Sequence, residues 1–195
     1  MLKEIAESVG ATEPALRLLV SLLIGYPIAV IHRYTLYGKS PTLQHLYFLS
    51  CGVAIGYFNY GFDVLHSIST VVIMYLTLLA IGGTLLSVYA SFLFNMGYLL
   101  FGYYFTGTEN YDIKWSMPQC VLALRLIGLT FDIYDGRKNA ELSREQKNTA
   151  LSKIPSFLEV AAHTYFPASF LVGPQFPMRR YQDLVAGNLR DKVRE

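Results

Sequence analysis

The chain has 195 residues, of which 53% are hydrophobic, 14% aromatic and only 15% charged. A soluble domain carries about 25% charged residues, whereas the only formally charged side chain between Ser40 and Thr108 is Asp63. A stretch of that length with one charge cannot form a surface in water, which excludes a soluble enzyme and a disordered chain. The net charge of +2 offers no basic surface for nucleic acid. The composition therefore predicts an integral membrane protein with several spans.

Apolar runs follow one another along the chain, and most approach the length of a membrane-crossing helix. Such a helix needs about 20 residues, with a range of roughly 17 to 25. Several runs lie at the short end of this range, which is typical of a thin bilayer or of re-entrant segments. We predict an all-α fold, a polytopic bundle of about six transmembrane segments with short interfacial helices. The segments are Ala15–Ile31, Leu43–Phe58, Leu65–Ile81, Leu85–Phe105, Gln119–Tyr134 and a weaker one, Phe157–Val172.

The joints between the early segments are short and rich in glycine. Asn59, Tyr60 and Gly61 separate the second segment from the third, and Gly82 with Gly83 separates the third from the fourth. Short connections of this kind favour antiparallel neighbours. We therefore expect the second, third and fourth segments to run alternately up and down.

Three flanking parts complete a single membrane domain over residues 1–195. Residues 1–14 form an amphipathic N-terminal arm, and residues 179–195 form a basic tail. Residues 135–156 form a polar loop, in which Ser143 and Gln146 match a capping box that satisfies two backbone donors. The loop is predicted to carry a short helix on the membrane surface.

Polar residues inside the apolar runs are the candidates for function. Arg125 and Asp132 are seven residues apart and lie on one stripe of the fifth segment. Charges at membrane depth cost about 2.5–3.5 kcal/mol each, so they usually face a partner or a wet cavity. A wet functional chamber is the interpretation we favour, and a structural ion pair with another helix or snorkelling to the interfaces is the alternative.

Other motifs have simpler interpretations. Glu159 and His163 share a helix face, which indicates a polar patch toward the bundle interior more than a metal or proton site. The Gly52-x-x-x-Gly56 spacing predicts close packing within the bundle. There is no nucleophile elbow, phosphate-binding loop or dinucleotide fingerprint. We expect no metal site and no cofactor.

Specific strings resemble a known family. Residues 110–118 read NYDIKWSMP, residues 124–129 read LRLIGL, and residues 170–176 read FLVGPQF. These strings resemble the membrane-bound O-acyltransferase family, and the likeness extends from Ala15 to about Leu184. The resemblance implies a multi-pass enzyme of the endoplasmic reticulum membrane that takes part in phospholipid remodelling. Its substrates would be acyl-CoA and a lysophospholipid of the lysophosphatidylcholine type, with membrane lipid around it.

The resemblance also implies what this chain lacks. The family uses a histidine and an asparagine, and the histidine would act as general base on the acceptor hydroxyl. None of the four histidines matches that motif, so we expect an N-terminal fragment or short isoform without a catalytic residue. The alternatives are a non-catalytic membrane scaffold, a lipid-binding regulator or a small transporter. A homo-oligomer stays open, and no nucleic acid is expected.

The remaining candidates would line the chamber of the family. The polar loop Thr106–Pro118 and the stretch from Gly173 are expected to fold back beside protein or water, because non-helical backbone at membrane depth requires it. The alternative is that both are rigid turns that position helices. The candidate chamber-lining residues are Lys114, Trp115, Pro118, Arg125, Asp132 and Gln175.

Overall fold

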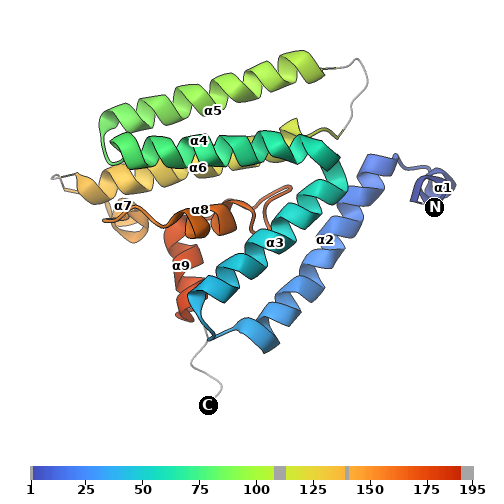
Figure 1. The fold of residues 1–195 in the computed structure, drawn as a ribbon, viewed down its shortest axis with the longest axis horizontal. Coiled ribbons are helices and arrows are strands. Elements are labelled where there is room, and N and C mark those ends of the chain that lie inside the picture. Colours follow the sequence, from blue (N-terminus) through green and yellow to red (C-terminus); the bar gives the residue numbers. More distant parts are fainter. Residues whose placement is uncertain (1, 108–112, 139–140, 190–195) are drawn as a thin grey trace.

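The computed structural model describes residues 2–107, 113–138 and 141–189, and this part of the chain is helical without strands (Figure 1). The predicted all-α class is therefore confirmed. Residues 110–112 of the family-like motif and residues 190–195 of the basic tail lie outside the described residues. The helices are α1 (Leu2–Val9), α2 (Glu13–Ile31), α3 (Pro41–Tyr60), α4 (Val64–Ile81), α5 (Leu85–Thr106), α6 (Ser116–Arg137), α7 (Arg144–Thr149), α8 (Phe157–Thr164) and α9 (Met178–Ala186), with a π-helical turn at His32–Leu36 and a 3-10 turn at Gly61–Asp63.

The first five predicted segments coincide with α2 to α6. In the described residues, four helical stretches are long and apolar enough to span a membrane, fewer than the six expected. One of these stretches, Pro41–Ile81, contains both α3 and α4 and is 41 residues long. The chain is thus a multi-pass membrane protein, and apolar side chains of α2 and α5 face outward where lipid would lie, among them Leu19, Leu23, Leu93 and Leu100.

The sixth predicted segment, Phe157–Val172, does not span. Only α8 forms there, with eight residues, and the chain continues in turns to Val172. A capping box of Ser156 and Glu159 fixes where α8 begins. Pro167 has no N–H to continue a helical ladder, and the carbonyl groups at the end of α8 are bound by Arg125 instead. The predicted span is therefore wrong because tertiary contacts replace the next helical turns.

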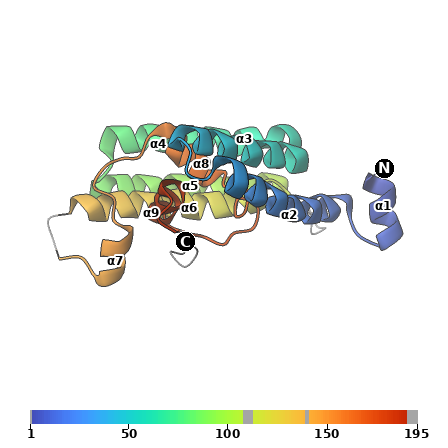
Figure 2. The same ribbon diagram turned by 90° about the horizontal axis from the view of Figure 1, so that it is seen from below.

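The helices form two groups that meet at α8. Helices α4, α5 and α6 lie alongside one another, while α2 and α3 run obliquely to them (Figure 1). Helices α4 and α5 are antiparallel as expected, but the expectation is wrong for α3 and α4, which diverge from their bend. The 3-10 turn after α3 redirects the chain obliquely, and Gly61 there has a φ of 56°, a value that favours glycine. The long helices form a flat assembly from which α7 projects (Figure 2).

The core lies where α8 packs between α3, α4 and α6. Val160 and Tyr165 are fully buried there, together with Leu78 of α4 and Ile133 of α6. The predicted close packing of the glycine motif is confirmed, since a Cβ on Gly52 would lie 1.7 Å from the Tyr165 carbonyl oxygen. The absence of a side chain at this position allows the end of α8 to rest directly on α3.

The predicted capping box in the polar loop is also confirmed. The Ser143 hydroxyl accepts a hydrogen bond from the Gln146 N–H, and the Gln146 side chain accepts one from the Ser143 N–H. The same Gln146 donates its side-chain amide to Asp135 at the end of α6. Helix α7 is therefore connected to α6 by the residue that caps it.

Candidate functional site

Arg125 occupies the centre of the described structure. It lies in the middle of α6, and only 4% of its surface is exposed. Nη1 donates to the carbonyl oxygens of His163 at 2.7 Å and Thr164 at 3.0 Å. Nη2 donates to the Ser169 hydroxyl at 2.8 Å and more weakly to its carbonyl at 3.4 Å. Nε donates to Oε1 of Gln175 at 3.2 Å.

These contacts occupy the full hydrogen-bonding capacity of the Arg125 side chain. A guanidinium has five N–H donors, and each has an acceptor here. The last carbonyl groups of a helix have no partner within it and carry partial negative charge. Arg125 supplies the missing donors to α8 and also lies 5.0 Å from the centre of the Phe176 ring. The arrangement holds the segment from α8 to Phe176 in place and leaves no donor for an anionic substrate.

His163 and Gln175 complete this cluster. His163 is 2% exposed, and its Nε2 donates to the Phe176 carbonyl oxygen at 3.1 Å, which assigns the proton to Nε2. Burial, and secondarily the charge of Arg125, lowers the pKa of His163 from 6.5 to about 3. Gln175 donates its amide to the Val121 carbonyl oxygen at 2.6 Å. The two predicted chamber residues Arg125 and Gln175 are thus brought together.

Asp132 lies apart from the Arg125 cluster, nearer the end of α6. It is seven residues from Arg125, about 10 Å along the helix axis, and is not among the partners of Arg125. Its backbone carbonyl accepts a hydrogen bond from the Leu151 N–H at 2.8 Å, which attaches the chain after α7 to α6. Among the described residues, no ion pair joins Arg125 or Asp132 to another helix, which was the alternative to a wet chamber.

The other three candidates lie together at the beginning of α6, apart from both Arg125 and Asp132. They are Lys114, Trp115 and Pro118. Pro118 is buried in the first turn of α6, where its missing N–H costs little. Lys114 donates to the Thr106 carbonyl oxygen, and the Trp115 ring stacks on His66 with 4.3 Å between ring centres. Lys114 and Trp115 line a pocket of about 650 Å³. Whether any of the six candidates lines a reaction chamber stays a prediction.

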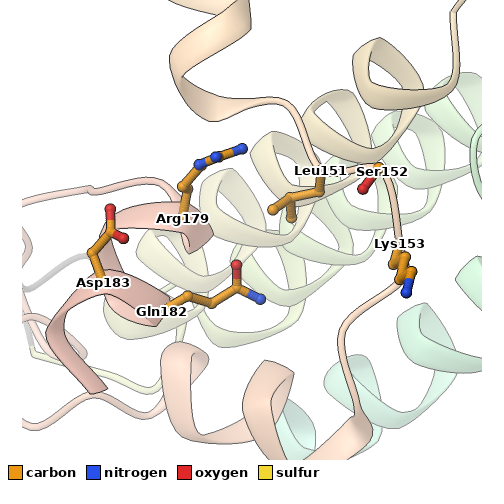
Figure 3. Close-up of a pocket in the computed structure, with 6 residues that line it drawn as sticks. All are labelled: Leu151, Ser152, Lys153, Arg179, Gln182 and Asp183. Atoms are coloured by element: carbon orange, nitrogen blue, oxygen red, sulfur yellow. The ribbon is translucent and has the colours of Figure 1, made fainter. Parts of the chain in front are cut away.

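A smaller hollow of about 290 Å³ lies between α9 and the segment after α7. Figure 3 shows Arg179 and Gln182 of α9 on the side of the stretch from Leu151 to Lys153, and Asp183 of α9 also lines the hollow. Arg179 donates to the Ala150 carbonyl oxygen, and Gln182 donates to Glu159. These bonds join α9 to its neighbours, and the hollow holds no nucleophile with an adjacent base.

The pair of Glu159 and His163 has separate structural roles. Glu159 caps α8 through Ser156, while His163 contacts Phe176. His163 faces the interior as expected, whereas Glu159 is occupied at the helix end. Among the described residues, no group of three or more His, Cys, Asp or Glu side chains could hold a metal ion.

Sequence reasoning missed the polar side chains buried between α4, α5 and α6. The side chain of Gln119 donates to the Thr70 hydroxyl at 2.9 Å, and the hydroxyl groups of Ser91 and Thr130 lie 3.1 Å apart. Uncharged polar residues in apolar helices commonly bond across membrane helices. The signal was present, because these residues interrupt otherwise apolar runs, but their partners lie 39 and 49 residues away.

Comparisons with known proteins agree with the resemblance seen in the motifs. Residues 100–195 match the model of the membrane-bound O-acyltransferase family. The chain is 49% identical over 191 residues to human lysophospholipid acyltransferase 5, covering 97% of this chain and 39% of that protein. It is 48% identical over 189 residues to the Drosophila melanogaster protein of the same name, of which it covers 38%. Lysophospholipid acyltransferase 6 of Drosophila melanogaster is 28% identical over 192 residues, with 94% of this chain and 26% of that protein covered.

Proposed function

Because the chain belongs to the membrane-bound O-acyltransferase family, we propose that it forms the N-terminal part of an acyl-CoA:lysophospholipid O-acyltransferase. The enzyme would move a fatty acyl group from acyl-CoA to the free hydroxyl of a lysophosphatidylcholine-type acceptor, in the endoplasmic reticulum membrane. The observation that carries this proposal is the 49% identity to human lysophospholipid acyltransferase 5 along 97% of the chain. No comparable argument favours a scaffold, a regulator or a transporter.

The described residues suggest a supporting role in this reaction. Acyl transfer needs a general base for the acceptor hydroxyl, whose own pKa is far too high for unaided attack on a thioester. His163 cannot serve as this base through Nε2, because that atom donates to the Phe176 carbonyl oxygen. The chain spans about 39% of human lysophospholipid acyltransferase 5, and we place the base in the part of the whole protein beyond this match.

In this proposal, the chain forms one wall of the reaction chamber. Arg125 and Gln175 hold the non-helical segment between α8 and α9 at membrane depth. Irregular backbone there is tolerated only beside protein or a water-filled cavity. The segment from Ser169 to Phe176 is thus the part of the chain that we propose to face the chamber.

A chimeric enzyme tests the proposal. The matching 191 residues of human lysophospholipid acyltransferase 5 are replaced by this chain, and acyl transfer from acyl-CoA to lysophosphatidylcholine is measured in membranes. We expect the chimera to retain activity well above a mock preparation, and the isolated chain in micelles to show none. A chimera that folds but has no activity would contradict the proposed function, and turnover by the isolated chain would contradict the placement of the base.

A further inference from the structure

The pocket of about 650 Å³ lies where the ends of several helices meet at one side of the bundle. Its lining comes from the beginning of α2, the bend between α3 and α4, the end of α5 and the stretch before α6. Three of the four candidate spans in the described residues begin or end near the pocket, at Glu13, Thr106 and Ser116, and the fourth, Pro41–Ile81, bends there. We therefore take the pocket to lie at a membrane boundary. The pocket shares no lining residue with the buried Arg125 cluster, and it contains two of the candidate chamber-lining residues, Lys114 and Trp115.

Opposite charges line this pocket. Asp63, the single formal charge between Ser40 and Thr108, lies at the bend. Its side chain is exposed and makes no capping bond to α4, and no hydrogen bond or ion pair joins it to another described residue. Arg17 of α2 and Lys114 before α6 bring positive charge to the same pocket. A ligand that carries both an anion and a cation would match this arrangement.

The Arg17 guanidinium is held in place by three hydrogen bonds and has further N–H donors that are not used in them. It donates twice to Glu13, at 2.7 and 3.1 Å, and once to the Phe58 carbonyl oxygen at 2.8 Å. Two of its five N–H donors therefore have no partner among the described residues. An arginine oriented in this way is suited to a phosphate group, which accepts hydrogen bonds from a guanidinium.

Aromatic rings form another side of the pocket. Trp115 is stacked on His66 with an angle of 11° between the ring planes. A Cβ on Gly102 would lie 2.7 Å from the Trp115 ring, so this glycine permits the close seating of the indole on α5. Tyr60 also lines the pocket. Trp115 is only 9% exposed and its ring is covered by the stacked His66 ring, so the pocket presents the exposed His66 side chain, with Tyr60, and not the indole face.

We propose that this pocket binds the headgroup of a zwitterionic phospholipid. The phosphate lies against Arg17 and Lys114, and the ammonium group lies beside Asp63. The apolar surface of α2 that follows Arg17, with Leu19 and Leu23 exposed, receives the acyl chains. This path favours a membrane lipid over a soluble phosphate compound. The proposed binding involves no chemical step.

Trp115 provides a direct probe, because it is the only tryptophan in the chain. The chain in maltoside micelles is titrated with phosphatidylcholine that carries a nitroxide on its headgroup, and quenching of tryptophan emission is followed. Unlabelled phosphatidylcholine, phosphatidylglycerol, phosphocholine and inorganic phosphate then compete. We expect saturable quenching that phosphatidylcholine reverses at least tenfold more effectively than the other three competitors.

The decisive variant is Asp63→Asn, because the exposed carboxylate holds no other described residue in place. We expect it to weaken lipid binding about tenfold without changing the melting temperature. Glu145→Gln on the exposed surface of α7 is the matched control and should bind as the unaltered chain does. Quenching that rises in proportion to the lipid content of the micelle, or that is the same in Asp63→Asn, would overturn the proposal. Equal competition by phosphatidylglycerol or by inorganic phosphate would overturn it as well.

Discussion

Removing the positive charge of Arg125 should destabilise the fold. In Arg125→Gln, the carbonyl oxygens at the end of α8 and the Ser169 hydroxyl lose donors that are buried with them. A buried acceptor that loses its donor costs about 1–3 kcal/mol, so the loss of three such donors should cost at least about 3 kcal/mol. For a chain of this length, 1 kcal/mol corresponds to roughly 2–4 °C in Tm. We therefore expect a decrease of about 10 °C.

The assay is thermal melting in maltoside micelles, followed by the fraction of protein that stays monodisperse. Arg144→Gln on the exposed surface of α7 is the control, and a surface change of this kind should stay within about 0.5 kcal/mol. A melting temperature for Arg125→Gln equal to that of the control would refute the reasoning and favour an arginine that faces a wet chamber.

A second variant separates the carbonyl contacts from an ion pair. If Arg125 were paired with Asp132, neutralising both residues would restore the stability that the single Arg125 change removes. Since Asp132 is not among the partners of Arg125 in the structure, the double variant Arg125→Gln with Asp132→Asn should melt no higher than Arg125→Gln alone. Recovery of the melting temperature in the double variant would show that the pair exists.

Three further predictions concern the core, the polar loop and pH. Gly52→Ala should cost about 2–3 kcal/mol of unfolding free energy, because its Cβ would overlap the backbone of α8; Gly97→Ala, with no atom within 4 Å, should cost nothing in the same melts. Ser143→Ala should remove about 0.5–2 kcal/mol of local stability and speed hydrogen exchange over residues 144–153, and unchanged exchange would contradict a role for the cap. The lowered pKa of His163 means that its unfolded form binds a proton more readily, so stability should fall as pH decreases from 6.5 toward about 3; His163→Gln should flatten that slope.

The long helices could be predicted from sequence because their signal is local. Each apolar run must satisfy its own backbone within the membrane, and a helix is the way one segment can do so. The boundaries of α2 to α6 accordingly fall within a few residues of the expected segments. The capping box at Ser143 is local in the same sense, and the unpredicted one at Ser156 could have been found from the same spacing.

The parts that could not be predicted depend on contacts between distant segments. The acceptors of Arg125 are mostly backbone carbonyl oxygens 38 to 44 residues away, and a backbone oxygen has no residue type that a sequence pattern could reveal. Sequence patterns could therefore indicate that Arg125 needs a partner or a wet cavity, but they could not identify these acceptors. The pocket around Trp115 also depends on His66, which lies on another helix.

The short α8 and the buried arginine explain each other. Had the segment from Phe157 continued as a membrane-length helix, its carbonyl groups would have been bonded within the helix and Arg125 would have had no acceptors. Because the helix stops after eight residues, it leaves carbonyl groups that require donors at a depth where water is scarce. Arg125 supplies N–H donors at that point. The carbonyl groups at the end of α8 thereby gain donors, and the buried guanidinium gains acceptors. A charge inside an apolar run therefore indicates, in this chain, where the backbone of another segment stops being helical.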